Sequence, residues 1–141
     1  MGRSLNFESS KNLSTVSTIY DWLLQQKAER TDVILAVGGG VATDLIGYVA
    51  ATWLRGVKII HIPTSLIGMV DAAVGGKTAV NIKMGKNMVG AFHQPKGIIM
   101  DTSVLSSLPK REMISGWAEA LKHAFLFDND LLKRFEENSE K

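Results

Sequence analysis

The stretch Asp32-Val33-Ile34-Leu35-Ala36-Val37-Gly38-Gly39-Gly40 decides the fold of this chain. Its apolar run is rich in branched side chains and predicts a strand buried on both faces, as in a parallel sheet. Residues 41–54 follow with apolar side chains at helical spacing. A strand, glycines and a helix in this order direct free backbone N–H groups at a phosphate. A tight turn explains the glycines equally well, and the G-x-G-x-x-G fingerprint of a standard Rossmann site is missing.

Further strands and helices alternate along the chain. Residues 57–62 form a second branched, apolar run that Pro63 ends, and residues 97–101 predict a third, shorter strand. Thr64 or Ser65 can cap a helix that begins after the proline. Strands separated by helices predict an α/β fold with a parallel sheet.

An amphipathic helix is predicted before the first strand. Apolar side chains recur at three- and four-residue steps within residues 8–30, which is typical of a helix with one buried face. Ser10 or Ser14 can cap its start. In the second predicted helix, Asp44 either complements the helix dipole or hydrogen-bonds a cofactor.

The sequence changes character after Pro109. Residues 110–127 and 130–137 contain no strand-like run and predict helices. We therefore expect a partial α/β domain over residues 1–109 and the start of a helical domain over residues 110–141.

The composition excludes several classes of protein. The 141 residues are 45% hydrophobic and 21% charged, with a formal net charge of +2. This charge is too small to indicate a nucleic-acid or membrane partner. No cysteine is present, so disulfides and thiolate metal sites are excluded, and a cytoplasmic protein is expected. No apolar run approaches the roughly 20 residues that a membrane span needs.

A polar segment after the second strand is the best candidate for a binding site. Residues 70–87 carry Asp71, Lys77, Lys86, a Gly-Gly pair and two asparagines within a short span. Open α/β sheets bind ligands where their strands end. Lysines beside glycine backbone suit an anionic, phosphorylated ligand. A solvated loop is the alternative, and we expect residues 87–95 to be irregular.

Glu119, Lys122 and His123 are spaced to share one helix face. A carboxylate and an imidazole four residues apart can both bind one divalent ion, and zinc accepts nitrogen and oxygen ligands. A surface ion pair beside a structural histidine explains the same spacing. Neither a G-x-S-x-G motif nor a Walker motif occurs in the chain.

Several motifs in register resemble the 3-dehydroquinate synthases. They are, in chain order, Gly38-Gly39-Gly40-Val41-x-x-Asp44-Leu45-x-Gly47, Arg55-Gly56, Pro63-Thr64-Ser65-Leu66, Val70-Asp71-x-x-Val74-Gly75-Gly76-Lys77-Thr78-Ala79, Gly85-Lys86-Asn87-x-x-Gly90-x-Phe92-x-Gln94-Pro95, Leu108-Pro109-x-Arg111-Glu112 and Gly116-x-Ala118-Glu119-x-x-Lys122. The similarity extends from Glu8 to Phe127, which is nearly the whole chain. Ser65 stands where a second threonine is usual, and it keeps the hydroxyl group.

The resemblance implies a partial, Rossmann-like α/β domain that binds NAD, followed by the first helices of an all-α domain that binds zinc or cobalt. The family converts the phosphorylated keto acid 3-deoxy-arabino-heptulosonate 7-phosphate to 3-dehydroquinate in the shikimate pathway. NAD oxidises a ring hydroxyl, the neighbouring C–H becomes acidic, and phosphate leaves. The ketone is then reduced again, and an aldol addition closes the new ring.

The resemblance also assigns roles to residues by position. Cofactor binding is implied for Glu8, Lys11, Gly39, Gly40, Val41, Asp44, Thr64, Ser65, Ile67, Asp71 and Lys86. Substrate binding is implied for Arg55, Asp71, Lys77, Asn87 and Lys122, and catalysis for Asp71, Lys77 and Lys122. Glu119 resembles a zinc ligand, whereas His123 is interpreted as structural. Arg55 resembles an arginine that reaches the substrate of a neighbouring subunit, which implies a homodimer.

The resemblance places essential groups outside the 141 residues. The family's first βα units are expected before Glu8, and two zinc-binding histidines are expected after Lys141. We therefore interpret the chain as a central piece of the enzyme that is inactive alone, because catalytic zinc takes at least three protein ligands. Three alternatives stay open. They are a sister cyclase acting on glucose 6-phosphate or sedoheptulose 7-phosphate, a metal-dependent polyol dehydrogenase, and a non-catalytic NAD-binding piece.

Overall fold

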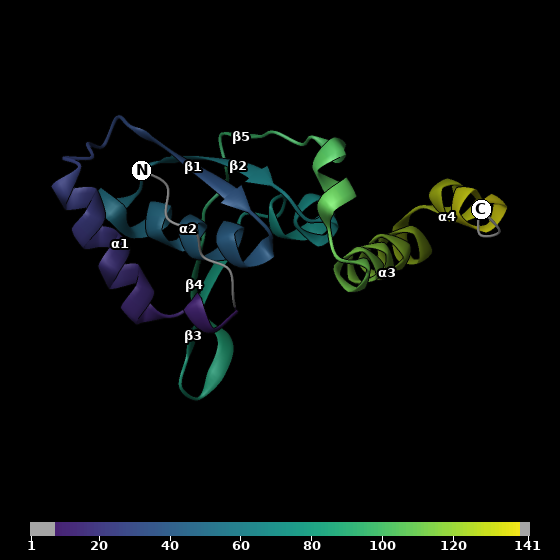
Figure 1. Ribbon diagram of the computed structural model, residues 1–141, viewed down its shortest axis with the longest axis horizontal. Helices are drawn as coiled ribbons and strands as arrows, with labels where there is room; N and C mark the ends of the chain where they lie inside the picture. Colours follow the sequence, from purple (N-terminus) through teal and green to yellow (C-terminus); the bar gives the residue numbers. More distant parts are fainter. Residues whose placement is uncertain (1–7, 139–141) are drawn as a thin grey trace.

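The computed structural model describes residues 8–138 (Figure 1). The helical elements are η1 (Glu8–Ser10), α1 (Leu13–Gln25), α2 (Gly40–Thr52), η2 (Trp53–Arg55), η3 (Gly68–Ala72), η4 (Thr102–Ser107), α3 (Lys110–Phe127) and α4 (Asn129–Glu137). The strands are β1 (Val33–Gly38), β2 (Lys58–Pro63), β3 (Lys77–Ile82), β4 (Gly85–Phe92) and β5 (Gly97–Ile98). This order of elements confirms the α/β fold that the sequence predicts.

Three strands form a parallel sheet in the order β1-β2-β5. In the register of β1 and β2, Val33 lies opposite Lys58 and Gly38 lies opposite Pro63. Both strands therefore end at the same edge of the sheet. The loops after them are joined there, because the Thr64 N–H donates to the Gly38 carbonyl at 2.9 Å.

The expectation that β1 is buried on both faces is wrong. Val33, Leu35 and Val37 are 45%, 58% and 61% exposed, while Ala36 between them is buried. Helices α1 and α2 both lie on one side of the sheet (Figure 1), and α2 contacts β1. Within the described residues β1 pairs only with β2, so one long edge and one face of this strand stay uncovered.

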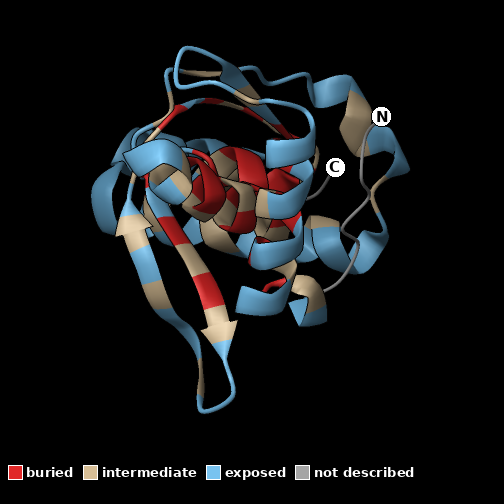
Figure 2. Ribbon diagram, turned by 90° about the vertical axis from the view of Figure 1, so that its left-hand side faces the viewer, coloured by how far each residue is buried: buried red, intermediate tan, exposed pale blue. Residues whose placement is uncertain are grey.

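Residues 87–92 of the segment expected to be irregular belong to a β-hairpin, whereas residues 93–95 are irregular as predicted. Strands β3 and β4 pair antiparallel, with Lys77 opposite Phe92 and Val80 opposite Val89. Only β3 carries buried side chains, as the red bands along one hairpin arm in Figure 2 show, because β3 packs against α2. The third predicted strand is also shorter than expected, since β5 covers residues 97–98 alone.

The hydrophobic core lies between α1, α2 and β3. Its buried members are Val16, Ile19, Leu23, Leu45, Val49 and Val80. Helix α1 is shorter than the predicted span, and its cap is Asn12 rather than Ser10 or Ser14. The Asn12 side chain accepts a hydrogen bond from the Thr15 N–H at 2.9 Å. This bond satisfies one of the backbone N–H groups of the first turn that have no partner within the helix.

The helical segment after β2 begins as the sequence predicts. Of the two expected caps, Ser65 acts, because its hydroxyl oxygen accepts from the Gly68 N–H at 3.3 Å. The segment continues as η3, a π-helical turn that carries Asp71. Single π-helical turns are frequent at functional sites.

Two helices complete the described chain. Helix α3 begins directly after Pro109 and packs against η3, and α4 packs against α3. Many apolar side chains of α3 are exposed, including Ile114, Trp117, Phe125 and Phe127. None of the helices within residues 8–138 is long and apolar enough to cross a membrane. The domain boundary near Pro109 stays a prediction.

Candidate functional site

A cavity of about 1210 Å³ opens where β1 and β2 end. All the residues that the resemblance assigned to the cofactor line it, namely Glu8, Lys11, Gly39, Gly40, Val41, Asp44, Thr64, Ser65, Ile67, Asp71 and Lys86. They come from η1, from the loop before α1, from the starts of α2 and of the segment after β2, and from the hairpin. The fold therefore gathers residues that are separated by up to 78 positions, from Glu8 to Lys86, around one space.

The same cavity extends along β1 towards α1. This part is apolar and is lined by Trp22, Leu23, Leu35 and Val37, among others. The sequence predicts that Leu35 and Val37 are buried in a strand covered on both faces, whereas both side chains are exposed here. Residues 33–37 are continuously apolar, so the sequence contains no signal that separates a strand covered on one face from a strand buried on both.

A second cavity of about 450 Å³ adjoins the first. Asp44, Asp71 and Asn87 line both cavities, and Lys77 lines the second. Lys77 is exposed and is the first residue of β3, so it is a strand residue rather than the loop residue that the sequence indicated. A cationic amine in a recess beside two carboxylates suits a ligand that carries both hydroxyl and anionic groups.

A buried ion pair connects the loop before α1 to α2. The ammonium group of Lys11, which is 4% exposed, donates to the Asp44 carboxylate and to the side-chain oxygen of Asn87. Burial raises the pKa of Asp44, and the nearby Lys11 offsets part of this effect. Asp44 therefore binds a lysine of the same chain, a role that neither sequence interpretation included. Its 33-residue separation from Lys11 hides this pairing from local patterns.

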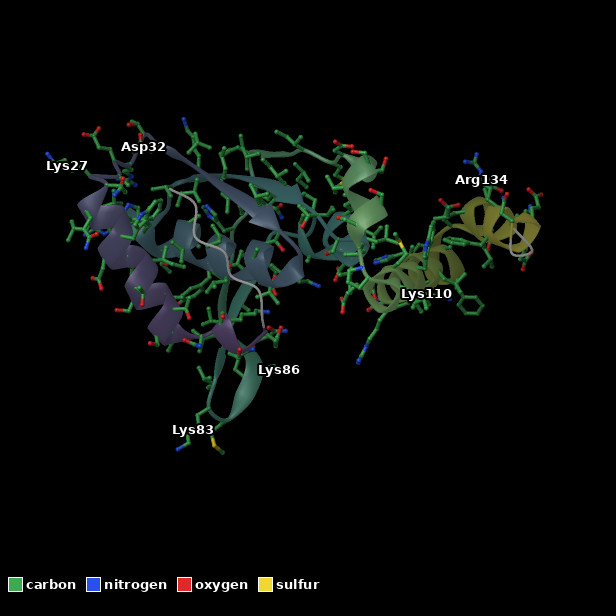
Figure 3. The ribbon with its side chains drawn as sticks, viewed as in Figure 1. Lys27, Asp32, Lys83, Lys86, Lys110 and Arg134 are labelled. Atoms are coloured by element: carbon green, nitrogen blue, oxygen red, sulfur yellow. The ribbon has the colours of Figure 1, made fainter. Side chains whose placement is uncertain are left out.

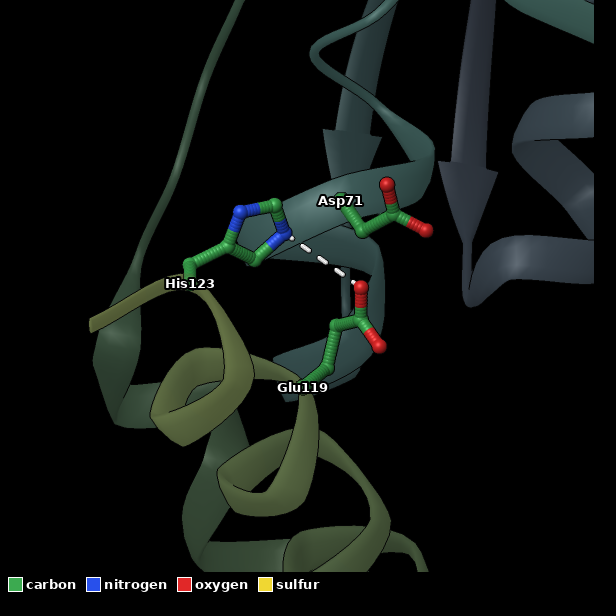
Figure 4. Close-up of side chains that lie close together, drawn as sticks. All are labelled: Asp71, Glu119 and His123. Carbon is green, nitrogen blue, oxygen red and sulfur yellow. Dashed lines mark ion pairs between the residues drawn. The ribbon is translucent and has the colours of Figure 1, made fainter. Parts of the chain in front are cut away.

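Three possible metal ligands meet where α3 packs against η3 (Figure 4). One ligand atom from each of Asp71, Glu119 and His123 lies within 4.8 Å of the other two. The His123 Nε2 atom is 3.3 Å from a Glu119 oxygen. Lys122 also donates to Glu119, and this hydrogen bond lowers the pKa of the carboxyl group. Asp71 and His123 are additions to the predicted ligand Glu119.

The other histidines lie elsewhere. His61 is 2% exposed in β2, and burial, with a smaller contribution from His93, lowers its pKa. The Nε2 atom of His93 is 2.8 Å from the Val57 carbonyl oxygen. Arg55 lines neither cavity and lies at the end of η2, with a backbone φ of 66°.

Gly116 brings α3 close enough to η3 for Glu119 to approach Asp71. A Cβ atom at this position would lie 2.5 Å from Leu66 Cβ and 2.8 Å from the Ile67 backbone nitrogen. We expect Gly116→Ala to destabilise the protein by up to about 2 kcal/mol. Overpacking costs about 1–3 kcal/mol, and this exceeds the gain of about 1 kcal/mol from better helix propensity.

Urea unfolding measures this effect. Gly97→Ala is the control, because a Cβ atom there would meet nothing within 4 Å. A Gly116→Ala protein as stable as the wild type would contradict the close contact.

The fold and the cavities together define an α/β domain with a cavity at the ends of its parallel strands, which is where open α/β sheets bind ligands. Residues 4–115 match the family model described as 3-dehydroquinate synthase N-terminal. The chain belongs to the 3-dehydroquinate synthase family. It is 50% identical over 133 residues to the 3-dehydroquinate synthase of Corynebacterium pseudotuberculosis (strain C231), covering 94% of this chain and 37% of that protein.

Solved structures of sugar-phosphate cyclases have the same fold. The 2-epi-5-epi-valiolone synthase from Streptomyces hygroscopicus subsp. jinggangensis 5008, solved with NAD⁺ and Zn²⁺ bound, aligns with a TM-score of 0.90 at 36% identity, over 95% of this chain and 38% of that one. A 2-deoxy-scyllo-inosose synthase complexed with carbaglucose-6-phosphate, NAD⁺ and Co²⁺ aligns with a TM-score of 0.86 at 35% identity, over 92% of this chain and 36% of that one. The chain thus spans little more than a third of these relatives.

Proposed function

We propose that the intact protein is a 3-dehydroquinate synthase, a lyase that converts 3-deoxy-arabino-heptulosonate 7-phosphate to 3-dehydroquinate and phosphate. The observation that carries this proposal is the arrangement of the two cavities. The residues assigned to the dinucleotide line the larger one, and it shares Asp44, Asp71 and Asn87 with the smaller one that Lys77 lines. A cofactor and a substrate in these cavities would meet beside Asp71.

The residues at the start of α2 fit a dinucleotide. Gly39 caps this helix, and a Cβ atom there would lie 3.1 Å from the Ser65 hydroxyl oxygen, in the space between the two strand ends. Glycine therefore lets the start of the helix lie close to Ser65, and the free N–H groups of the first helical turn suit a pyrophosphate. The apolar part of the cavity offers a place for the adenine ring. The NAD⁺ in the valiolone synthase structure supports this assignment.

The donor set at η3 and α3 fits a divalent metal. Asp71 and Glu119 offer oxygen and His123 offers nitrogen, which zinc and cobalt both accept. We propose Glu119 as a ligand, and the lowered pKa of its carboxyl group keeps it in the ionised form that ligands need. When bound, such a metal would polarise the hydroxyl oxygen that is oxidised.

The side chains of this chain would mainly hold and orient the substrate. Lys77, Asn87 and Lys122 present donors that suit carboxylate, phosphate and hydroxyl oxygens. Lys122 lines neither cavity, and its ammonium group donates to Glu119. Asp71 lines both cavities and lies beside Glu119 and His123, so it is placed to orient the carbon that reacts.

Two further parts of the proposal concern assembly and location. Arg55 is exposed and lines neither cavity of its own chain, which is consistent with a role at the site of a second copy in a homodimer. A cytoplasmic location agrees with a chain that has no cysteine and is part of the proposal.

A sister cyclase is the second candidate function, because both of the aligned solved structures have related activities. The higher identity to a 3-dehydroquinate synthase favours the first candidate. The test supplies the intact protein with NAD, a divalent metal and one phosphate ester at a time. We expect phosphate release from the heptulosonate ester without net NADH. Release from glucose 6-phosphate or sedoheptulose 7-phosphate instead would support a sister cyclase, and accumulation of NADH would indicate a dehydrogenase.

A further inference from the structure

Asn81 of β3 connects Asn87 of the same hairpin to the segment that holds Glu8 and Lys11, which is distant in sequence. Its side-chain amide donates to the Glu8 carboxylate at 2.8 Å, and its side-chain oxygen accepts from the Asn87 backbone N–H at 2.9 Å. Its own backbone N–H donates to the Lys11 carbonyl at 2.8 Å. Asn81 does not line either cavity. Asn81 therefore contacts Glu8, Lys11 and Asn87 without facing either cavity itself.

The contact with Asn87 fixes an uncommon backbone conformation. Asn87 has a φ of 56°, in the left-handed region that asparagine adopts more readily than most residues other than glycine. The Asn81 oxygen binds its N–H, and Lys11 binds its side-chain oxygen. The backbone and side chain of Asn87 are thus held by separate partners. This arrangement sets the direction in which Asn87 faces the two cavities.

The contact with Glu8 fixes a carboxylate at the rim of the larger cavity. Glu8 is exposed, and besides Asn81 its carboxylate has the Lys86 ammonium group 3.8 Å away. An ion pair at this distance between exposed groups contributes little. The short hydrogen bond from the Asn81 amide is therefore the stronger restraint on the position of this carboxylate.

We propose that Asn81 is a positioning residue that orients Glu8 towards the dinucleotide and Asn87 towards the substrate. The inference rests on the proposed function, because it takes from it the ligands of these two residues. The amide group of Asn81 suits this double role, because its NH₂ group donates to Glu8 while its oxygen accepts from the Asn87 N–H. A carboxylate at the same place would keep the acceptor side alone.

Two variants separate the two contacts. Asn81→Asp has nearly the same shape and can still accept from the Asn87 N–H, but it faces Glu8 with a second negative charge. Asn81→Ala removes both side-chain contacts. Both variants keep the backbone hydrogen bond to Lys11. Lys83→Ala is the control, because Lys83 is exposed at the tip of the same hairpin and lines neither cavity (Figure 3).

The experiment measures the Kd of NAD and the KM of the heptulosonate phosphate for the intact protein and each variant. A lost hydrogen bond to a charged group corresponds to about a tenfold effect. We expect Asn81→Asp to raise the Kd of NAD by about tenfold and to leave the KM within about twofold. Asn81→Ala should raise both by about five- to tenfold, and Lys83→Ala should change neither.

The outcomes distinguish this inference from the proposed function. If the wild type binds NAD and turns over the substrate while both Asn81 variants match it, the positioning role is wrong and the function stands. If both constants rise equally in Asn81→Asp, the residue acts only on the fold, which also overturns the inference. A wild type that binds neither compound overturns both proposals. Should Asn81→Ala not fold, the nearly isosteric Asn81→Asp variant decides alone.

Discussion

Replacing Lys77 by alanine is expected to lower kcat/KM for the phosphorylated substrate by about 10- to 100-fold in the intact protein. A hydrogen bond to a charged group contributes about 1.5–3 kcal/mol, and each 1.4 kcal/mol corresponds to a factor of ten. Stability should change by less than about 0.5 kcal/mol, because Lys77 is exposed and its side chain is not part of the core. Steady-state kinetics and urea unfolding of the same preparation check both parts.

Lys83→Ala is the matched control for this prediction. It removes the same charge from the same hairpin, but at a position that lines neither cavity. We expect its kinetics to equal those of the wild type. If Lys77→Ala lost thermal stability in proportion to its activity, a structural role in the hairpin would explain the loss, and the substrate-binding role would be wrong.

Glu119→Gln is expected to weaken the binding of zinc or cobalt by at least about 100-fold. Losing a residue that only supports a ligand already costs about 10- to 100-fold in metal affinity. A neutral amide is a poorer ligand than a carboxylate. The substitution keeps the shape of the side chain, so α3 should still pack against η3 through Gly116. Metal content after dialysis against a defined free-metal buffer measures the effect.

Glu137→Gln on α4 is the control for the metal experiment, because this exposed glutamate lies outside the cluster of Asp71, Glu119 and His123. Its metal content should equal that of the wild type. Unchanged metal content in Glu119→Gln would remove Glu119 from the ligand set. His123→Ala then measures whether the imidazole in the cluster is a ligand or only a partner of Glu119.

The central β1–α2–β2 unit could be predicted from the sequence. Its apolar runs are short and branched, and Gly38 and Pro63 mark where they end. What the sequence could not provide is the burial of β1. An apolar strand has the same residues whether one face or both are covered, and only the position of α1 and α2 on one side decides between these cases.

The hairpin could not be predicted because its second strand has weak strand propensity. Strand β4 contains Gly85, Gly90, Lys86 and Asn87, which are depleted in strands. Its pairing with β3, which α2 holds through buried Thr78 and Val80, overrides this local preference. For the same reason residues 87–92 have the local composition of an irregular segment, although they form a strand.

The candidate site was predicted in part. The glycines after β1 and the lysines after β2 indicate an anionic ligand by their chemistry alone. The Lys11–Asp44 pair and the contacts of Asn81 depend on segments that meet only after folding. The metal cluster could be predicted only in part. The spacing of Glu119 and His123 predicts that they share a helix face, whereas Asp71 joins them from η3 only after folding.

A crystal structure of the intact protein with NAD bound tests the central claim most directly. The account predicts the pyrophosphate at the start of α2, with its oxygens about 2.7–3.2 Å from backbone nitrogens of Gly39, Gly40 or Val41, and the nicotinamide facing Asp71. A dinucleotide bound away from the ends of β1 and β2 would contradict it.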